Sequence, residues 1–99
     1  MNAYTIARTM KDTPGVESVG HYTDENGNPT ETRVDFTDGA FIIATDEHDD
    51  QGNINGFTFT HYASQAHHDA GDETETDGSD DIADLASVIM HTASEALFS

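Results

Sequence analysis

The sequence predicts an α+β fold, in which a four-stranded antiparallel β-meander carries a short N-terminal helix and a longer C-terminal helix packed on one face. Three observations support this prediction. Apolar residues recur at helical spacing near both ends of the chain. Between the ends lie short runs in which apolar and polar residues alternate, which is typical of strands. Turn dipeptides separate these runs, and Asp38-Gly39 is the strongest hairpin signal.

The N-terminal helix is expected over about residues 2–12. Asn2 is suited to the N-cap, because its side chain can accept a hydrogen bond from a free backbone N–H of the first turn. Pro14-Gly15 ends the segment. One face of this helix is apolar and consists of Ala3, Ile6, Ala7 and Met10.

The C-terminal helix is expected over about residues 81–97, with Ser79 or Asp80 as its cap. Aspartates at the start of this segment are favoured by the positive end of the helix dipole. Its apolar stripe should pack across the sheet and supply much of the core. The stripe consists of Ile82, Leu85, Ala86, Ile89, Ala93, Ala96 and Leu97.

Strands are expected at about residues 16–23, 30–37, 40–46 and 54–62. The first alternates imperfectly, which is compatible with a bulge near Gly20. The third contains Phe41-Ile42-Ile43-Ala44 and is apolar on both faces, which indicates a central strand. After the fourth strand, residues 63–68 suggest a helical turn and residues 69–78 an acidic loop. We expect one domain, residues 1–99, because the length is that of a single small core.

The charge of the chain is its dominant feature. Twenty acidic residues oppose three basic ones, for a formal net charge of −17. The bases are Arg8, Lys11 and Arg33, so residues 34–99 contain fifteen acids and no lysine or arginine. DNA and anionic membranes would repel such a surface, whereas a basic protein would be attracted to it. We therefore expect no direct nucleic-acid or membrane binding, and a basic, nucleic-acid-binding protein as the partner.

The compartment has few sequence signals. The chain has no cysteine, and no apolar segment approaches the ~20 residues of a membrane helix. The first residues lack the basic start and apolar run of a signal peptide. We expect a cytoplasmic protein, or one in the host cytoplasm if it is encoded by a virus.

Neither a metal site nor a catalytic site is predicted. His61, His67 and His68 could suggest zinc, but adjacent histidines point apart in most conformations, and zinc needs converging ligands. The segment from Glu73 to Asp84, with Gly78 at its bend, resembles a calcium loop but lacks the bidentate Glu at its end. No nucleophile elbow or phosphate-binding Gly-rich loop occurs. We expect no cofactor and no enzymatic activity.

Two accounts of the acidity compete. Asp outnumbers Glu thirteen to seven, one Lys is present and Thr is abundant at thirteen, a composition similar to that of halophile proteins. On this account the acidity serves solvation in salt. The acids are nevertheless concentrated, with four in residues 46–50 and eight in residues 69–84. On the second account these carboxylates stand in for nucleic-acid phosphates and occupy a basic surface.

The element order and the charge together resemble those of small virus-encoded inhibitors of DNA-targeting defence systems. That resemblance implies a DNA mimic that inhibits by protein–protein interaction, without implying a role for any particular residue. From the charge distribution we expect the partner-binding residues to be Asp46, Glu47, Asp49, Asp50, Asp69, Asp72, Glu73, Glu75, Asp77, Asp80, Asp81 and Asp84. The oligomeric state has no signal in the sequence.

Overall fold

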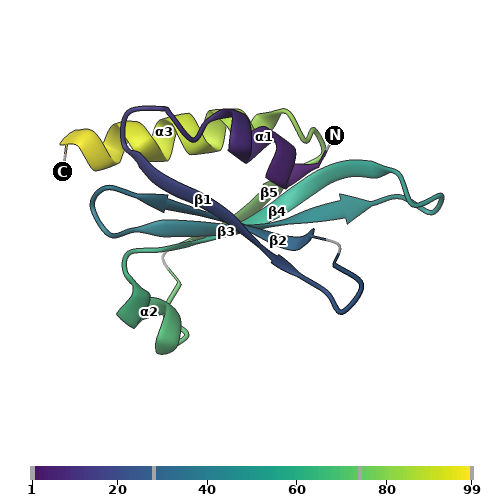
Figure 1. Ribbon diagram of the computed structural model, residues 1–99, viewed down its shortest axis with the longest axis horizontal. Coiled ribbons are helices and arrows are strands. Elements are labelled where there is room, and N and C mark those ends of the chain that lie inside the picture. The colour runs from purple at the N-terminus through teal and green to yellow at the C-terminus, as the bar shows by residue number, and fades with distance from the viewer. Residues whose placement is uncertain (1, 28, 74, 99) are drawn as a thin grey trace.

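The computed structural model describes residues 2–27, 29–73 and 75–98 of the chain, which form an α+β fold (Figure 1). A five-stranded antiparallel sheet has the order β1-β2-β3-β4-β5. Helices α1 and α3 lie along one face of the sheet, and the short helix α2 lies on its other side. The elements are α1 (Ala3–Thr9), β1 (Val16–Thr23), β2 (Pro29–Phe36), β3 (Phe41–His48), β4 (Ile54–Tyr62), α2 (Gln65–Asp69), β5 (Glu75–Ser79) and α3 (Asp84–Phe98).

The α+β class, the antiparallel sheet and the two terminal helices are confirmed, but the prediction of four strands is wrong. Residues 75–78, expected to be part of an acidic loop, and Ser79, expected as a possible helix cap, form β5 against β4. This strand has no alternation of apolar and polar residues, so its conformation depends on pairing with a neighbour. The helical turn expected after β4 is α2, which Ser64 caps by accepting from the His67 N–H.

Helix α1 begins as expected and ends earlier than expected. The Asn2 side chain accepts from the Thr5 N–H at 2.8 Å, which confirms the N-cap. The helix stops at Thr9 instead of residue 12, and turns carry the chain to β1. Beyond Thr9 the N–H groups of Met10 and Thr13 donate to carbonyls three residues back, so tighter turns replace the regular helix before Pro14.

Tight turns fix the register of the first two hairpins. In the β2–β3 turn the Gly39 N–H donates to the Phe36 carbonyl at 3.1 Å, and Gly39 adopts the positive φ that glycine allows. Gly27 has the same role in the β1–β2 turn. The irregularity of β1 lies at Glu17, between Val16 and Ser18, and a second one lies at its end, so the bulge expected near Gly20 is misplaced.

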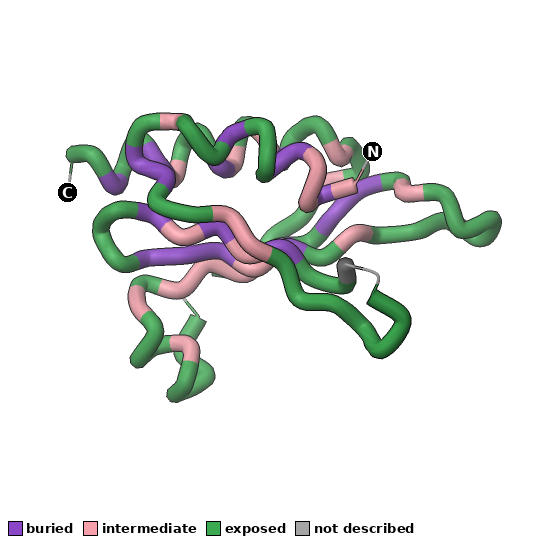
Figure 2. The backbone as a smooth tube through the Cα atoms, viewed as in Figure 1, coloured by how far each residue is buried: buried purple, intermediate pink, exposed green. Residues whose placement is uncertain are grey.

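Strand β3 is central, as predicted, and its side chains are buried on both faces of the sheet. Ile42 and Ala44 face α1 and α3, together with Val34 of β2 and Phe59 of β4. The main core lies between these helices and the sheet (Figure 2). It therefore occupies one face, and the opposite face has only a local apolar cluster.

That local cluster is built on Phe41, which is fully buried. The Arg33 guanidinium lies 3.8 Å from the centroid of the Phe41 ring and pairs with Asp35 at 3.0 Å. The rings of Tyr62 and His68 pack beside Phe41 and anchor α2 to this face. Partial burial disfavours the charge of Arg33, yet its interactions with Asp35 and Tyr22 outweigh that effect and raise its pKa.

Helix α3 buries the predicted stripe along most of its length, with Leu85, Ile89, Ala93 and Ala96 in the core. The helix begins at Asp84 instead of residue 81, and Leu97, expected in the stripe, is half exposed. Ser79 accepts from the Asp81 N–H at 3.1 Å, and the carboxylate of Asp81 accepts from the Ala83 N–H at 3.0 Å, so both side chains cap the turn before the helix. A turn over residues 82–83 therefore precedes the regular helix.

Helix α3 approaches the loop before β1 so closely that only glycine fits there. Gly15 is buried with φ of +96°, and a Cβ at this position would lie 2.2 Å from the Ala93 carbonyl oxygen. Gly27 also has positive φ, but a Cβ added there would meet open space, with no other part of the fold within 4 Å. Comparing substitutions at Gly15 and Gly27 therefore separates the cost of the backbone conformation from the cost of the clash with α3.

Gly15→Ala should lower the free energy of unfolding by about 2–5 kcal/mol, since it combines left-handed backbone with overpacking against α3. Gly27→Ala should cost about 1–2 kcal/mol, from backbone conformation alone. Urea unfolding followed by circular dichroism measures both. Equal losses for the two variants would contradict the close packing of α3 on Gly15.

Candidate functional site

Nearly all of the carboxylates face solvent. All twenty lie in the part of the chain that the structure describes; eighteen are exposed, and Asp35 and Asp46 are half-buried. Among the described residues, Arg33–Asp35 is the one ion pair between an arginine or lysine and a carboxylate. The acidity is therefore a property of the surface, with little internal neutralisation.

Strand β5 converts part of the acidic sequence into an ordered edge of the sheet. Its register places Ser79 opposite Phe57, Asp77 opposite Phe59 and Glu75 opposite His61. Since residues directly opposite each other share a face, Glu75 and Asp77 lie on the side of the sheet that carries α3. Charged residues on an edge strand also discourage pairing with other chains.

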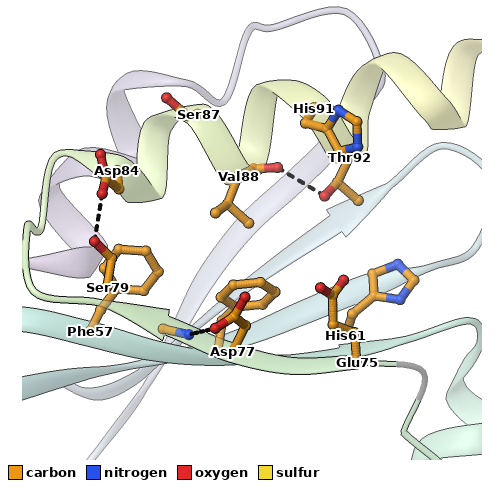
Figure 3. Close-up of a pocket in the computed structure, with 12 residues that line it drawn as sticks. Phe57, His61, Glu75, Asp77, Ser79, Asp84, Ser87, Val88, His91 and Thr92 are labelled. Carbon is orange, nitrogen blue, oxygen red and sulfur yellow. Dashed lines mark hydrogen bonds between the residues drawn. The ribbon is translucent and has the colours of Figure 1, made fainter.

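A groove runs between α3 and this edge of the sheet. Helix α3 packs mainly on α1 and β2, which leaves the β4–β5 end of the same face open. The groove has a volume of about 470 Å³. Figure 3 shows the rings of its floor below α3, with Glu75 and Asp77 rising from β5. Its lining comprises Phe57, Phe59, His61, Glu75, Asp77, Gly78, Ser79, Asp84, Ser87, Val88, His91 and Thr92.

A second hollow, of about 450 Å³, adjoins the groove and shares Phe57, Gly78 and Ser79 with it. Its lining includes Glu47 from the end of β3 and Asp80 from the segment after β5. The fold thus brings together acids from the two dense stretches, residues 46–50 and 69–84. Glu47 follows Asp46 in β3 and therefore points to the opposite side of the sheet from Glu75 and Asp77, so these acids surround the β4–β5 end of the sheet. We call this surface around the sheet end the β5 acidic face, and define it as Glu47, Glu75, Asp77, Asp80 and Asp84.

Several of the predicted binding residues have structural roles. The Asp46 carboxylate accepts from the Ala3 N–H at 2.7 Å and thereby caps α1 from β3. Asp49 accepts from the N–H groups of Gln51 and Asn53 and shapes the β3–β4 turn, in which Asp50 is exposed. Asp81 caps the turn that leads into α3. Within each acidic stretch of the sequence, some carboxylates therefore hold caps and turns, and others are exposed without such a role.

The acids at the end of α2 and directly after it, Asp69, Asp72 and Glu73, are not part of the β5 acidic face. The hydrogen bonds of Asp69 with Gln65 and His68 lower the pKa of its carboxyl group. Asp72 borders a shallow hollow of about 220 Å³ with Ala66, His67 and Ala70. Glu73 is exposed. These acids extend the negative surface beyond the groove, toward the second face of the sheet.

The histidines are separated by the fold. His61 lines the groove, whereas His68 packs on Phe41 and Tyr62 on the opposite face, and His67 is hydrogen-bonded to Ser64. Within the described ranges, no group of three or more histidine and carboxylate side chains is placed to hold a metal ion. Sequence reasoning missed His91 and the Phe57–Phe59 floor, whose place in a groove depends on where α3 docks.

No family model, curated protein or solved structure matches the chain. Among the described helices, none has the length and apolar character needed to cross a membrane. The geometry of the β5 acidic face and its groove is therefore the basis for assigning a function.

Asp46→Ala should lower the free energy of unfolding by about 0.5–2 kcal/mol, because α1 loses an acceptor for its first N–H groups. Asp50→Ala removes the same charge from an exposed turn and is the matched control. The difference in urea midpoint between the two variants isolates the Asp46–Ala3 hydrogen bond. If both variants unfold at the same midpoint, Asp46 does not have this structural role.

Proposed function

We propose that this protein is a small, non-enzymatic binding protein whose β5 acidic face occupies the basic surface of a nucleic-acid-binding partner. The observation that carries the proposal is the gathering of exposed acids in two adjoining hollows around β5, one lined by Glu75, Asp77 and Asp84 and the other by Glu47 and Asp80. Residues 34–99 contain no lysine or arginine to offset these charges. Such a surface matches a cleft that normally binds phosphates.

Electrostatics would supply steering and selectivity in this role. Complementary charge raises the rate of encounter and disfavours partners of the same sign. The same field repels DNA and RNA, which favours competition with nucleic acid over binding to it. An inhibitor of a DNA-targeting protein, including a virus-encoded one acting in the host cytoplasm, is the form of this function that we favour.

The carboxylates of the groove are better suited to binding than to catalysis. General acid–base chemistry uses carboxylates in sites that shift their proton affinity, commonly by excluding water. Glu75, Asp77 and Asp84 are all exposed to solvent. Exposed carboxylates can pair with a partner's cations without any chemical step.

Neutralising four acids of the β5 acidic face should weaken the partner complex about 30-fold. The variant is Glu47→Gln, Glu75→Gln, Asp77→Asn and Asp80→Asn. At roughly 0.5 kcal/mol per exposed pair, the loss is about 2 kcal/mol. The matched control, Asp12→Asn, Glu17→Gln, Glu25→Gln and Glu31→Gln, removes as much charge from β1, β2 and the turns beside them. It should reduce the binding free energy by less than a third as much.

The partner for this measurement is obtained by affinity capture from nuclease-treated lysate with a wash of rising salt, and is then purified. The complex should release the nucleic acid bound by that partner, and its Kd should rise with salt as charges are screened. A partner that binds this protein and nucleic acid simultaneously would contradict the proposal. So would equal losses for the two quadruple variants.

Salt adaptation is a second candidate, favoured by the acids that lie away from the β5 acidic face. Asp12, Glu17, Glu25 and Glu31 are also exposed, so the negative charge covers the β1–β2 part of the molecule as well. Self-repulsion at this charge density would destabilise the fold in dilute buffer. This candidate accounts for the surface through solvation and leaves the binding function open.

On the salt-adaptation account, the melting temperature should rise by roughly 5 °C or more between dilute buffer and molar salt. For a domain of this size, that shift corresponds to a gain of about 1 kcal/mol in the free energy of unfolding. Screening over a Debye length that shrinks from ~10 Å at 0.1 M to ~3 Å at 1 M would cause the rise. The variant Glu17→Lys, Glu25→Lys and Glu31→Lys should respond less steeply. A melting temperature of the unmodified protein that does not change with salt, measured by calorimetry, would contradict the salt-adaptation account.

A further inference from the structure

We propose that the groove between α3 and β5 binds an arginine side chain, carried on an extended segment of the partner. This inference rests on the proposed function and deepens it, since it names the partner group that is recognised. The guanidinium would stack over Phe59 and pair with Asp77. The groove contains a cross-strand pair of the kind that already binds a guanidinium elsewhere in the same sheet.

The internal precedent is the Arg33 cluster on the second face. Phe41 of β3 lies directly opposite Asp35 of β2. Arg33 stacks at 3.8 Å over the Phe41 ring and donates to the Asp35 carboxylate from Nε and Nη2, at 3.0–3.2 Å. Arginine is suited to this arrangement because its planar head both stacks on rings and bridges a carboxylate.

The groove repeats the pairing without the cation. Phe59 of β4 lies directly opposite Asp77 of β5, and both residues line the groove. The side chain of Glu75, from the same strand, faces the groove in Figure 3, and its carboxylate has no hydrogen-bonding partner in the described part of the chain. The chain has no lysine or arginine after Arg33, so an arginine for this groove must come from another molecule, and the basic side chains of the chain's own that line it are His61 and His91.

The remaining lining suits the stem of an arginine. Phe57, Phe59 and Val88 give the groove an apolar floor and wall, against which the methylene groups of a long basic side chain can pack. The volume of about 470 Å³ lies within the range of ~300–1,000 Å³ typical of small-ligand sites. The Asp84 carboxylate accepts from the Ser79 hydroxyl at one end of the groove, so Asp77 and Glu75 of β5 are the carboxylates that face the charged head.

Recognition by side chains fits the edge of β5 better than strand addition does. The Asp77 carboxylate accepts from the Gly78 N–H at 2.8 Å, which occupies a main-chain donor of this strand. A partner segment therefore finds its strongest contacts in the groove and along the carboxylate rim. One arginine anchored in the groove would fix the register of the surrounding charge pairs.

The test is an NMR titration of the isotope-labelled protein with the capped tripeptide acetyl-Gly-Arg-Gly-amide. Saturable shifts should be confined to the groove, including the side-chain signals of Phe59 and Val88. The lysine analogue of the peptide should bind at least threefold more weakly, because an ammonium group cannot both stack and bridge. Asp77→Asn should weaken arginine binding about fivefold, and Asp12→Asn, which removes an equal charge elsewhere, less than twofold.

Phe59→Leu keeps the floor apolar and removes the ring, so it should erase the preference for arginine over lysine. Equal binding of the two peptides to the unmodified protein would overturn the proposal, and that comparison needs no variant to fold. Equal effects of Asp77→Asn and Asp12→Asn would also overturn it. In either case the proposed function would stand, because it requires only the charge of the β5 acidic face, which the quadruple variants test.

Discussion

The pairing of β5 with β4 is the interaction on which the functional surface depends. It orders residues 75–79, places Glu75 and Asp77 on the side of α3, and brings Asp80 to the same hollow as Glu47. Gly56 permits this arrangement, since a Cβ there would lie 2.2 Å from the Ser79 carbonyl oxygen. Without the pairing, the same acids would belong to a solvated loop with no fixed geometry.

The excess of carboxylates constrains the rest of the fold. Burying an unpaired charge costs more free energy than the packing of one small core can offset. The acids therefore lie in turns, on strand edges and at helix starts. The apolar residues fill one main layer, between α1, α3 and the sheet, and a local cluster at Phe41. Because α3 packs on α1 and β2, it leaves β4 and β5 partly uncovered, and the groove lies at this open end of the sheet.

Elements that have a clear pattern within their own residues could be predicted from the sequence. Helix α3 has a long apolar stripe, and the β2–β3 hairpin has Asp38-Gly39 at its turn. Strand β5 could not be predicted, because its pairing is a tertiary effect on a polar segment. The acidic stretches were visible, but the division between Asp46, which caps α1, and Glu47, which faces solvent, depends on which side of β3 each occupies.

The central claim is that acids distant in sequence act as one binding face along β5. The most direct measurement is a map of backbone amide shifts as the purified basic partner is added to the isotope-labelled protein. The account predicts changes centred on residues 75–84, with a second group near Glu47 at the end of β3. Changes centred on the β1–β2 hairpin, or spread evenly over all exposed acids, would contradict it.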